Sequence, residues 1–201
     1  MASALEQHCE EVVFLGPITT GREKTLRNWN RRSVHYLHKR YDVDHSLYLS
    51  AGYARAFSEK LARMRVDVIY APAASTEIAL LRTKVPIVYM SNTTYALVRS
   101  YYPGYLNLLP LSYWEADLVE CRAIRKASRV IYPSHWAANS AIRDYSADPS
   151  HIHVFPMGAN MEELPDRERV ASRTRVNHLR LLFVGVDWVR KGGLSCKTVS
   201  R

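Results

Sequence analysis

Short apolar runs alternate with helical patterns along most of this chain, and that alternation restricts it to one fold class. The runs are rich in β-branched residues and stop at proline or polar residues, so we expect strands at 12–17, 66–72, 85–90, 129–133 and 151–156. Helical spacing or a capping serine predicts helices at 23–39, 46–65, from 75 onward, 111–127 and 135–145. Strands that are apolar throughout suit a sheet buried on both faces, and strand–helix alternation implies parallel pairing. The sequence therefore predicts an α/β fold with a doubly wound, Rossmann-like parallel sheet.

The expected domain organisation follows from the two ends of the chain. A doubly wound domain normally opens with a strand and a tight loop, whereas residues 2–8 look like the tail of a helix. Residues 161–177 are polar and charged like a linker, and an apolar run at 179–185 opens another strand. We therefore expect a sheet domain at 1–157 without its first strand, an interdomain linker at 158–178 and the start of a second domain at 179–201. On this interpretation the fold is incomplete at both ends.

The charge balance favours anionic partners. The formal net charge is +9, and basic residues gather in the expected helix region 22–40. This basic run has two interpretations: a solvated helix face, or peripheral contact with an anionic membrane surface. No nucleic-acid-binding motif accompanies the charge, so nucleic acid is not an expected partner.

Three further observations place the chain in the cytoplasm, where peripheral contact with the inner face of the membrane is the alternative left open. No apolar run approaches the roughly 18–20 residues of a membrane span. The first residues lack the basic-then-apolar pattern of a secretory signal. The three cysteines are scattered and odd in number, which fits a reducing compartment.

Polar side chains follow two of the expected strands, at the ends where ligands bind in open α/β sheets. Ser134 stands between the strand at 129–133 and the next helix, so its hydroxyl can either cap that helix or line a cleft. Asn92 and Thr93, followed by Thr94, come after the strand at 85–90. Amide and hydroxyl groups both donate and accept, so these side chains could bind a polyol; a plain loop is the alternative. We take Asn92, Thr93 and Ser134 as the candidate acceptor-side cleft.

An aromatic stretch follows the second of these sites. We expect residues 95–105 to form a loop, and its rings either stack on a sugar or pack internally; they are Tyr95, Tyr101, Tyr102 and Tyr105.

A phosphate-binding pattern closes the sequence. After the strand at 179–185 come a short polar loop, Lys191 and the glycine pair Gly192–Gly193. A lysine can pair with a phosphate, glycines let the backbone approach a ligand, and a helix N-terminus adds free N–H donors. Gly185, Lys191 and Gly192 are therefore the candidate donor-phosphate site.

Other site chemistries find no support in the residue patterns. His151 and His153 alternate on a strand, and His35 and His38 fit one helix face, but no carboxylate or cysteine supplies a persuasive third ligand, so we expect no metal. Neither a G-x-S-x-G elbow nor a Walker-type phosphate loop is present. We expect no tightly bound cofactor, and no catalytic residue is assigned.

Three segments, in this order, carry a family resemblance. They are the strand–serine–helix element at 130–136, the strand and glycine turn at 152–160, and the strand and cationic loop at 182–192. Together they resemble the family 4 glycosyltransferases, retaining enzymes of the two-domain GT-B fold. The resemblance implies that the N-terminal domain binds a glycan or lipid-linked acceptor and the C-terminal domain binds a nucleotide-sugar donor, which is a cosubstrate rather than a cofactor. It assigns Lys191 to the donor diphosphate, Gly185 to a close-approach turn and Gly158 to the interdomain hinge.

Two departures from the family pattern bear on activity. Val186 stands where many members carry an arginine, and the paired-glutamate motif that grips the donor would lie beyond residue 201. We therefore expect a glycosyltransferase by descent whose transfer activity is weak or absent in this chain alone. The alternative is a non-catalytic α/β binding module that docks on a glycan, a partner or an anionic membrane.

Overall fold

A computed structural model describes residues 5–158, 166–168 and 188. The chain divides into two compact units, Met1–Pro156 and Met157–Arg201, and the helices and strands named below all belong to the first. The expected strand at 179–185 and the cationic loop after it lie outside the described residues. The domain boundaries drawn from the sequence remain a prediction.

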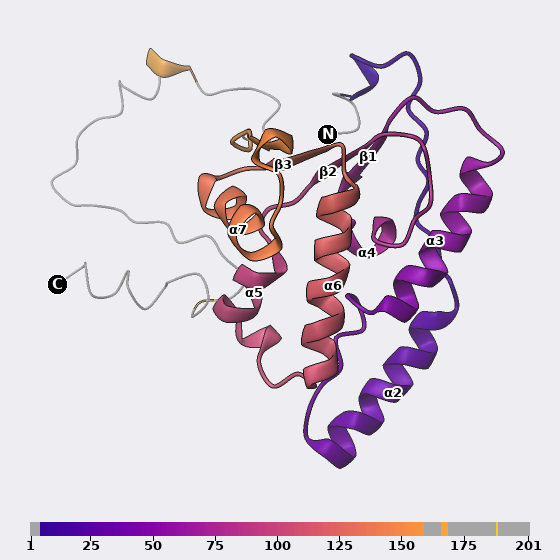
Figure 1. Cartoon of the computed structure of the whole chain (residues 1–201), viewed down its shortest axis with the longest axis vertical. Coiled ribbons are helices and arrows are strands. Elements are labelled where there is room, and N and C mark those ends of the chain that lie inside the picture. Colours follow the sequence, from indigo (N-terminus) through magenta and orange to yellow (C-terminus); the bar gives the residue numbers. More distant parts are fainter. Residues whose placement is uncertain (1–4, 159–165, 169–187, 189–201) are drawn as a thin grey trace, which may run out of the picture. The chain divides into compact units, whose positions relative to one another are not determined.

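Four parallel strands form a sheet whose spatial order follows the sequence (Figure 1). They are β1 (Ile69–Pro72), β2 (Ile87–Met90), β3 (Arg129–Tyr132) and β4 (Ile152–Val154). The register aligns Tyr70 with Val88, Tyr89 with Val130, and Ile131 with His153. Each strand lies inside a range predicted from the sequence, and the Rossmann-like α/β fold class is confirmed.

The connections between these strands cross over through helices. α4 (Ser75–Ile78) links β1 to β2, α6 (Pro110–Lys126) follows β2 and leads into β3, and α7 (His135–Tyr145) links β3 to β4. Since each crossover moves one strand in the same direction, right-handed connections place these helices on one face. In agreement, α6 runs between α4 and α7 and contacts both (Figure 1). The described strands are added in one direction only, as in either half of a doubly wound sheet.

The main core lies between this helix layer and the sheet. Several of the buried helix residues are small, and Ala123 of α6 and Ala137 and Ala141 of α7 are fully buried. Their short side chains let the helices approach the sheet closely, where Tyr89 and Tyr132 supply the bulk. Burial of this kind stabilises a fold by roughly 25 cal/mol per Å² of apolar surface.

Two longer helices precede the sheet strands. α2 (Arg22–Leu37) and α3 (Leu47–Leu61) share a smaller core, which consists of Leu26, Tyr41, Val43 and Leu49. The Ser46 hydroxyl caps α3 by accepting from the Leu49 amide at 3.1 Å. α3 also contacts α4 and α6, which joins the smaller core to the sheet.

The sequence interpretation was wrong at three places. Residues 11–20 form no strand, because no described strand pairs with them and the side chains of Val13 and Phe14 stay exposed. The aromatic stretch is not a loop but α5 (Tyr95–Tyr101) and a 3₁₀ turn (Pro103–Tyr105). Ser75 does not cap α4; it is the first helical residue, and Ala74 precedes it without a side-chain hydrogen bond.

Ala73 adopts a strained backbone just after β1. Its φ of 50° is left-handed, and its N–H donates to the carbonyl of Met90 at 2.7 Å. Because glycine adopts this conformation without a Cβ clash, we expect Ala73→Gly to raise the free energy of unfolding by about 0.5 kcal/mol. Urea denaturation measures the change. Ala54→Gly is the matched control, since Ala54 lies inside α3 and a glycine there lowers stability; equal losses in both variants would contradict the strain.

Candidate functional site

The carboxyl ends of the strands form one continuous edge of the sheet. Backbone hydrogen bonds join the segments that leave it: the Ser91 amide donates to the Ile131 carbonyl at 3.1 Å, and the Phe155 amide to the Tyr132 carbonyl at 2.9 Å. We call residues 73–75, 91–94, 133–134 and 155 the carboxyl edge. Ligands of open α/β sheets bind outside such an edge, so this is the candidate site.

Ser134 caps α7, as the sequence predicted. Its Oγ accepts from the Ala137 amide at 3.3 Å, and its backbone is extended, as an N-cap requires. The residue is half-buried at the carboxyl edge. In this cap the Ser134 Oγ accepts a hydrogen bond, so its O–H group can still donate one. Its role in lining an acceptor cleft remains a prediction.

Asn92 and Thr93 occupy the loop after β2, and they differ from Thr94. Asn92 is exposed, whereas the half-buried Thr93 has a buried Oγ1 that meets no partner among the described residues. The Ser91 hydroxyl donates to the Thr93 carbonyl at 2.8 Å and so shapes the loop. Thr94 is fully buried with its Oγ1 2.6 Å from the Oγ of Ser140, so its expected contact with a polyol is wrong.

A buried carboxylate lies in the core near this edge. Glu120 of α6 is only 3% exposed, and the Tyr89 hydroxyl donates to it at 3.3 Å. Burial raises the pKa of Glu120 to about 7, and the charge of His45 and the hydroxyls of Tyr89 and Ser75 offset only part of that rise. The Tyr132 hydroxyl nearby is buried without a hydrogen-bond partner in the described part of the chain. Glu120 can therefore gain or lose a proton close to neutral pH.

His45 interacts electrostatically with Glu120. Burial lowers the pKa of His45, but the hydrogen bond and charge of Asp42 outweigh it, with further help from Glu120, so the net shift is upward. The Asp42 Oδ2 lies 3.0 Å from His45 Nδ1. Asp42 is itself fixed, because its amide donates to the Ser112 hydroxyl at 2.9 Å.

The rings of Tyr95 and Tyr105 pack beside that of His45. Tyr95 is buried, with its ring 5.1 Å from that of His45 and 5.7 Å from that of Tyr105. Tyr101 differs, since it is 67% exposed and lies 6.3 Å from the ring of Trp136. Internal packing, one of the two interpretations left open by the sequence, is therefore confirmed for Tyr95.

The sequence interpretation missed Glu120, His45 and Asp42. A signal for Glu120 was present, because it shares a helical face with Ala116 and Ala123, both fully buried. A charged residue inside an apolar stripe deserved notice. No comparable signal marks His45 and Asp42, which lie between α2 and α3 and reach the cluster only through tertiary packing.

The donor-side candidates cannot be placed beside this edge. Gly185, Lys191 and Gly192 lie outside the described residues. Gly158 is exposed, and a Cβ there would meet nothing within 4 Å. Steric space therefore does not explain a glycine at this position, and its hinge role remains a prediction.

A family comparison now bears on the carboxyl edge. Residues 1–163 match the family described as Glycosyltransferase Family 4. The chain belongs to Glycosyltransferase Family 4. No curated protein matches the chain. The family match spans the whole sheet, so the carboxyl edge and the cluster around Glu120 belong to the glycosyltransferase region.

None of the described helices of this family 4 chain combines the length and apolar character needed to cross a membrane. Within residues 5–158, 166–168 and 188, no group of three or more His, Cys, Asp or Glu side chains could hold a metal ion.

The raised pKa of Glu120 predicts a pH-dependent stability. A carboxyl whose folded pKa is about 7, against 4.5 in the unfolded chain, favours folding fully at low pH, and this contribution is lost as the pH rises through 7. We expect Glu120→Gln to reduce the fall in unfolding free energy between about pH 4 and about pH 8 by roughly 3 kcal/mol. Chemical denaturation across this range measures it.

Glu59→Gln is the control for this prediction. It removes the same charge from an exposed position on α3, where Glu59 pairs with Arg55. His45 and Glu77, whose raised pKa values have the same sign, contribute to the slope that remains in Glu120→Gln. An unchanged pH profile in Glu120→Gln would mean that the carboxyl does not titrate near neutrality.

Proposed function

We propose that this chain forms the acceptor-binding part of an enzyme that transfers a sugar from a nucleotide-sugar donor to a glycan or lipid-linked acceptor with retention of configuration. The observation that carries the proposal is a Glycosyltransferase Family 4 match over the sheet whose carboxyl edge presents Asn92, Thr93 and Ser134. Their amide and hydroxyl groups can donate to and accept from sugar hydroxyls. Asn92 supports this most directly, because its side chain is exposed and its amide can both donate and accept.

The proposed chemistry requires positioning rather than a protein nucleophile. The leaving diphosphate helps to deprotonate the acceptor on the same face of the sugar, so rate depends on holding both substrates and stabilising the departing charge. In the proposal, Lys191, Gly185 and Gly192 bind the diphosphate and Gly158 acts as the hinge. The carboxyl edge then orients the acceptor hydroxyl.

Glycan binding by the purified chain tests the acceptor side. On a glycan array, we expect retention of a subset of glycans, and the double substitution Asn92→Ala with Thr93→Ala lowers their affinity about tenfold, as expected for two lost hydrogen bonds at roughly 0.5–1.5 kcal/mol each. The control pair is Thr25→Ala with Asn28→Ala, exposed residues on α2. Binding that is absent, or equal in the two variants, would refute the acceptor assignment.

A specific observation also favours the membrane-docking alternative. α2 presents exposed cations on the face away from Leu26 and Ser33: Lys24, Arg27, Arg31 and Arg32. None of the four forms an ion pair with the described residues, and the Arg31 guanidinium contacts only Asn28, at 3.4 Å. Trp29 and Tyr36, 42% and 75% exposed, flank this face. A cationic stripe beside exposed aromatic rings is the surface that an anionic bilayer attracts.

Vesicle binding measures this contact. Each cation near an anionic leaflet contributes about 1 kcal/mol, so Arg31→Gln with Arg32→Gln lowers the partition coefficient roughly tenfold or more. Co-sedimentation uses vesicles of equal parts phosphatidylglycerol and phosphatidylcholine, with pure phosphatidylcholine as the uncharged reference. Equal sedimentation of wild type with both vesicles would refute α2 as a docking surface.

A further inference from the structure

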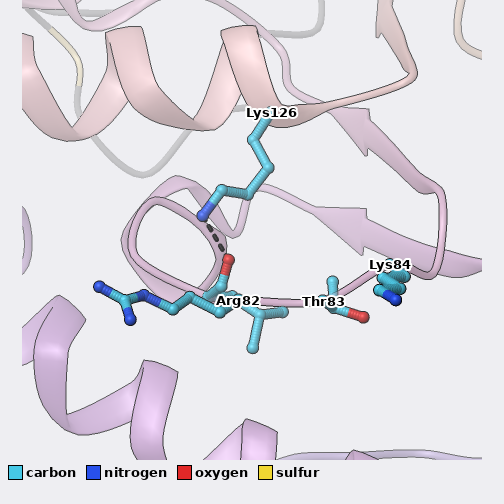
Figure 2. A pocket seen from close by; sticks show the side chains of 5 residues that line it. Arg82, Thr83, Lys84 and Lys126 are labelled. Carbon is cyan, nitrogen blue, oxygen red and sulfur yellow. Dashed lines mark hydrogen bonds between the residues drawn. The ribbon is translucent and has the colours of Figure 1, made fainter.

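An open cavity lies at the amino edge of the sheet, opposite the carboxyl edge. It has a volume of about 580 Å³ and is lined by Leu81, Arg82, Thr83, Lys84 and Lys126 (Figure 2). The first four follow α4 and lead into β2, and Lys126 is the last residue of α6, just before β3. Backbone bonds at this edge, such as the Ser128 amide to the Ile87 carbonyl at 2.8 Å, hold the two entry segments together.

The lining carries positive charge without a counterion. Its charged side chains are Arg82, Lys84 and Lys126, and none of them forms an ion pair with a described residue. The pKa of Lys126 is lowered, first by burial and then by the charges of Arg122 and Arg82. The charges of Lys126 and Arg82 therefore repel each other, and a bound anion would relieve that repulsion.

The hydrogen-bonding groups of the lining also favour an anion. The Lys126 ammonium donates to the carbonyls of Ala79, at 3.0 Å, and Leu81, which leaves its third N–H available. The Thr83 Oγ1 accepts from the Val85 amide at 3.0 Å, so its O–H remains a donor. The side chains thus offer several donors and no carboxylate, which suits an oxyanion with several acceptor oxygens.

Lys126 has a structural role in the fold, whereas Arg82 and Lys84 have none among the described residues. Lys126 binds carbonyls just after α4 and stands at the C-terminus of its own helix, where a cation is favourable. The side chains of Arg82 and Lys84 make no hydrogen bond within the described part of the chain. In Figure 2, Arg82 extends sideways below Lys126, and Lys84 lies on the other side of Thr83. Their long side chains can turn toward an occupant of the cavity.

We infer that this amino-edge cavity binds a phosphate-bearing ligand, through Arg82, Lys84 and the free N–H of Lys126. The site lies at the edge opposite Asn92, Thr93 and Ser134, so it does not depend on the proposed sugar transfer. The same chemistry fits a soluble phosphorylated molecule or a lipid headgroup, and the experiment separates these sources.

Isothermal titration of the purified 201-residue chain with inorganic pyrophosphate tests the inference. We expect Arg82→Gln with Lys84→Gln to weaken binding at least tenfold at low salt, since exposed charge contacts are screened as salt rises. The matched control is Arg63→Gln with Arg65→Gln, which removes the same charge from exposed positions after α3 and leaves pyrophosphate affinity unchanged. Circular dichroism confirms that each variant is folded.

A third variant separates this site from the proposed donor site. If Lys191→Gln abolishes pyrophosphate binding while Arg82→Gln with Lys84→Gln does not weaken it, the inference is overturned and the donor proposal stands. Absence of pyrophosphate binding, or equal loss in the Arg63→Gln with Arg65→Gln control, also overturns it. Vesicles with phosphatidylglycerol identify the source: reduced vesicle binding in the Arg82/Lys84 variant indicates a lipid headgroup, and unchanged vesicle binding indicates a soluble phosphate.

Discussion

The packing of α6 against the sheet is the interaction on which the described structure depends. Ala116, Val119 and Ala123 are fully buried along it, and the helix touches α3, α4, α5, α7 and β2. Because these side chains are small, α6 lies close to the strands and brings Glu120 within reach of the Tyr89 hydroxyl. The same packing that closes the core therefore also buries an ionisable group, which costs stability at neutral pH unless the carboxyl holds its proton.

The two edges of the sheet differ in chemistry although the same helices support both. At the carboxyl edge, neutral amide and hydroxyl groups follow β2 and β3, as recognition of an uncharged polyol requires. At the amino edge, Arg82, Lys84 and Lys126 gather where α4 and α6 end. A parallel sheet keeps these edges apart by the length of its strands, so an anion at one edge need not compete with a sugar at the other.

Much of the fold was predictable from the sequence, because buried parallel strands leave a local signal. The apolar run around Val130 and the serine at 134 predicted β3 and the start of α7 correctly. The run at 12–17 carries the same signal but has no described partner strand, and pairing is a tertiary property that composition does not report. Tyr95 was wrongly expected in a loop, because aromatic residues have only modest helix propensity. In the structure Tyr95 begins α5, and its buried ring packs against that of His45. The interaction between His45 and Glu120 was not predictable, because the two residues are far apart in sequence.

The buried contact between Thr94 and Ser140 ties the loop that carries Asn92 to the middle of α7, the helix that Ser134 begins. A second tie lies one turn away, where the Ala96 amide donates to the Tyr145 hydroxyl at 2.9 Å. Both polar segments of the carboxyl edge are consequently ordered when the chain folds. A ligand that spans them meets a pre-organised surface and loses little further conformational entropy on binding, so even a few weak hydrogen bonds can give measurable affinity.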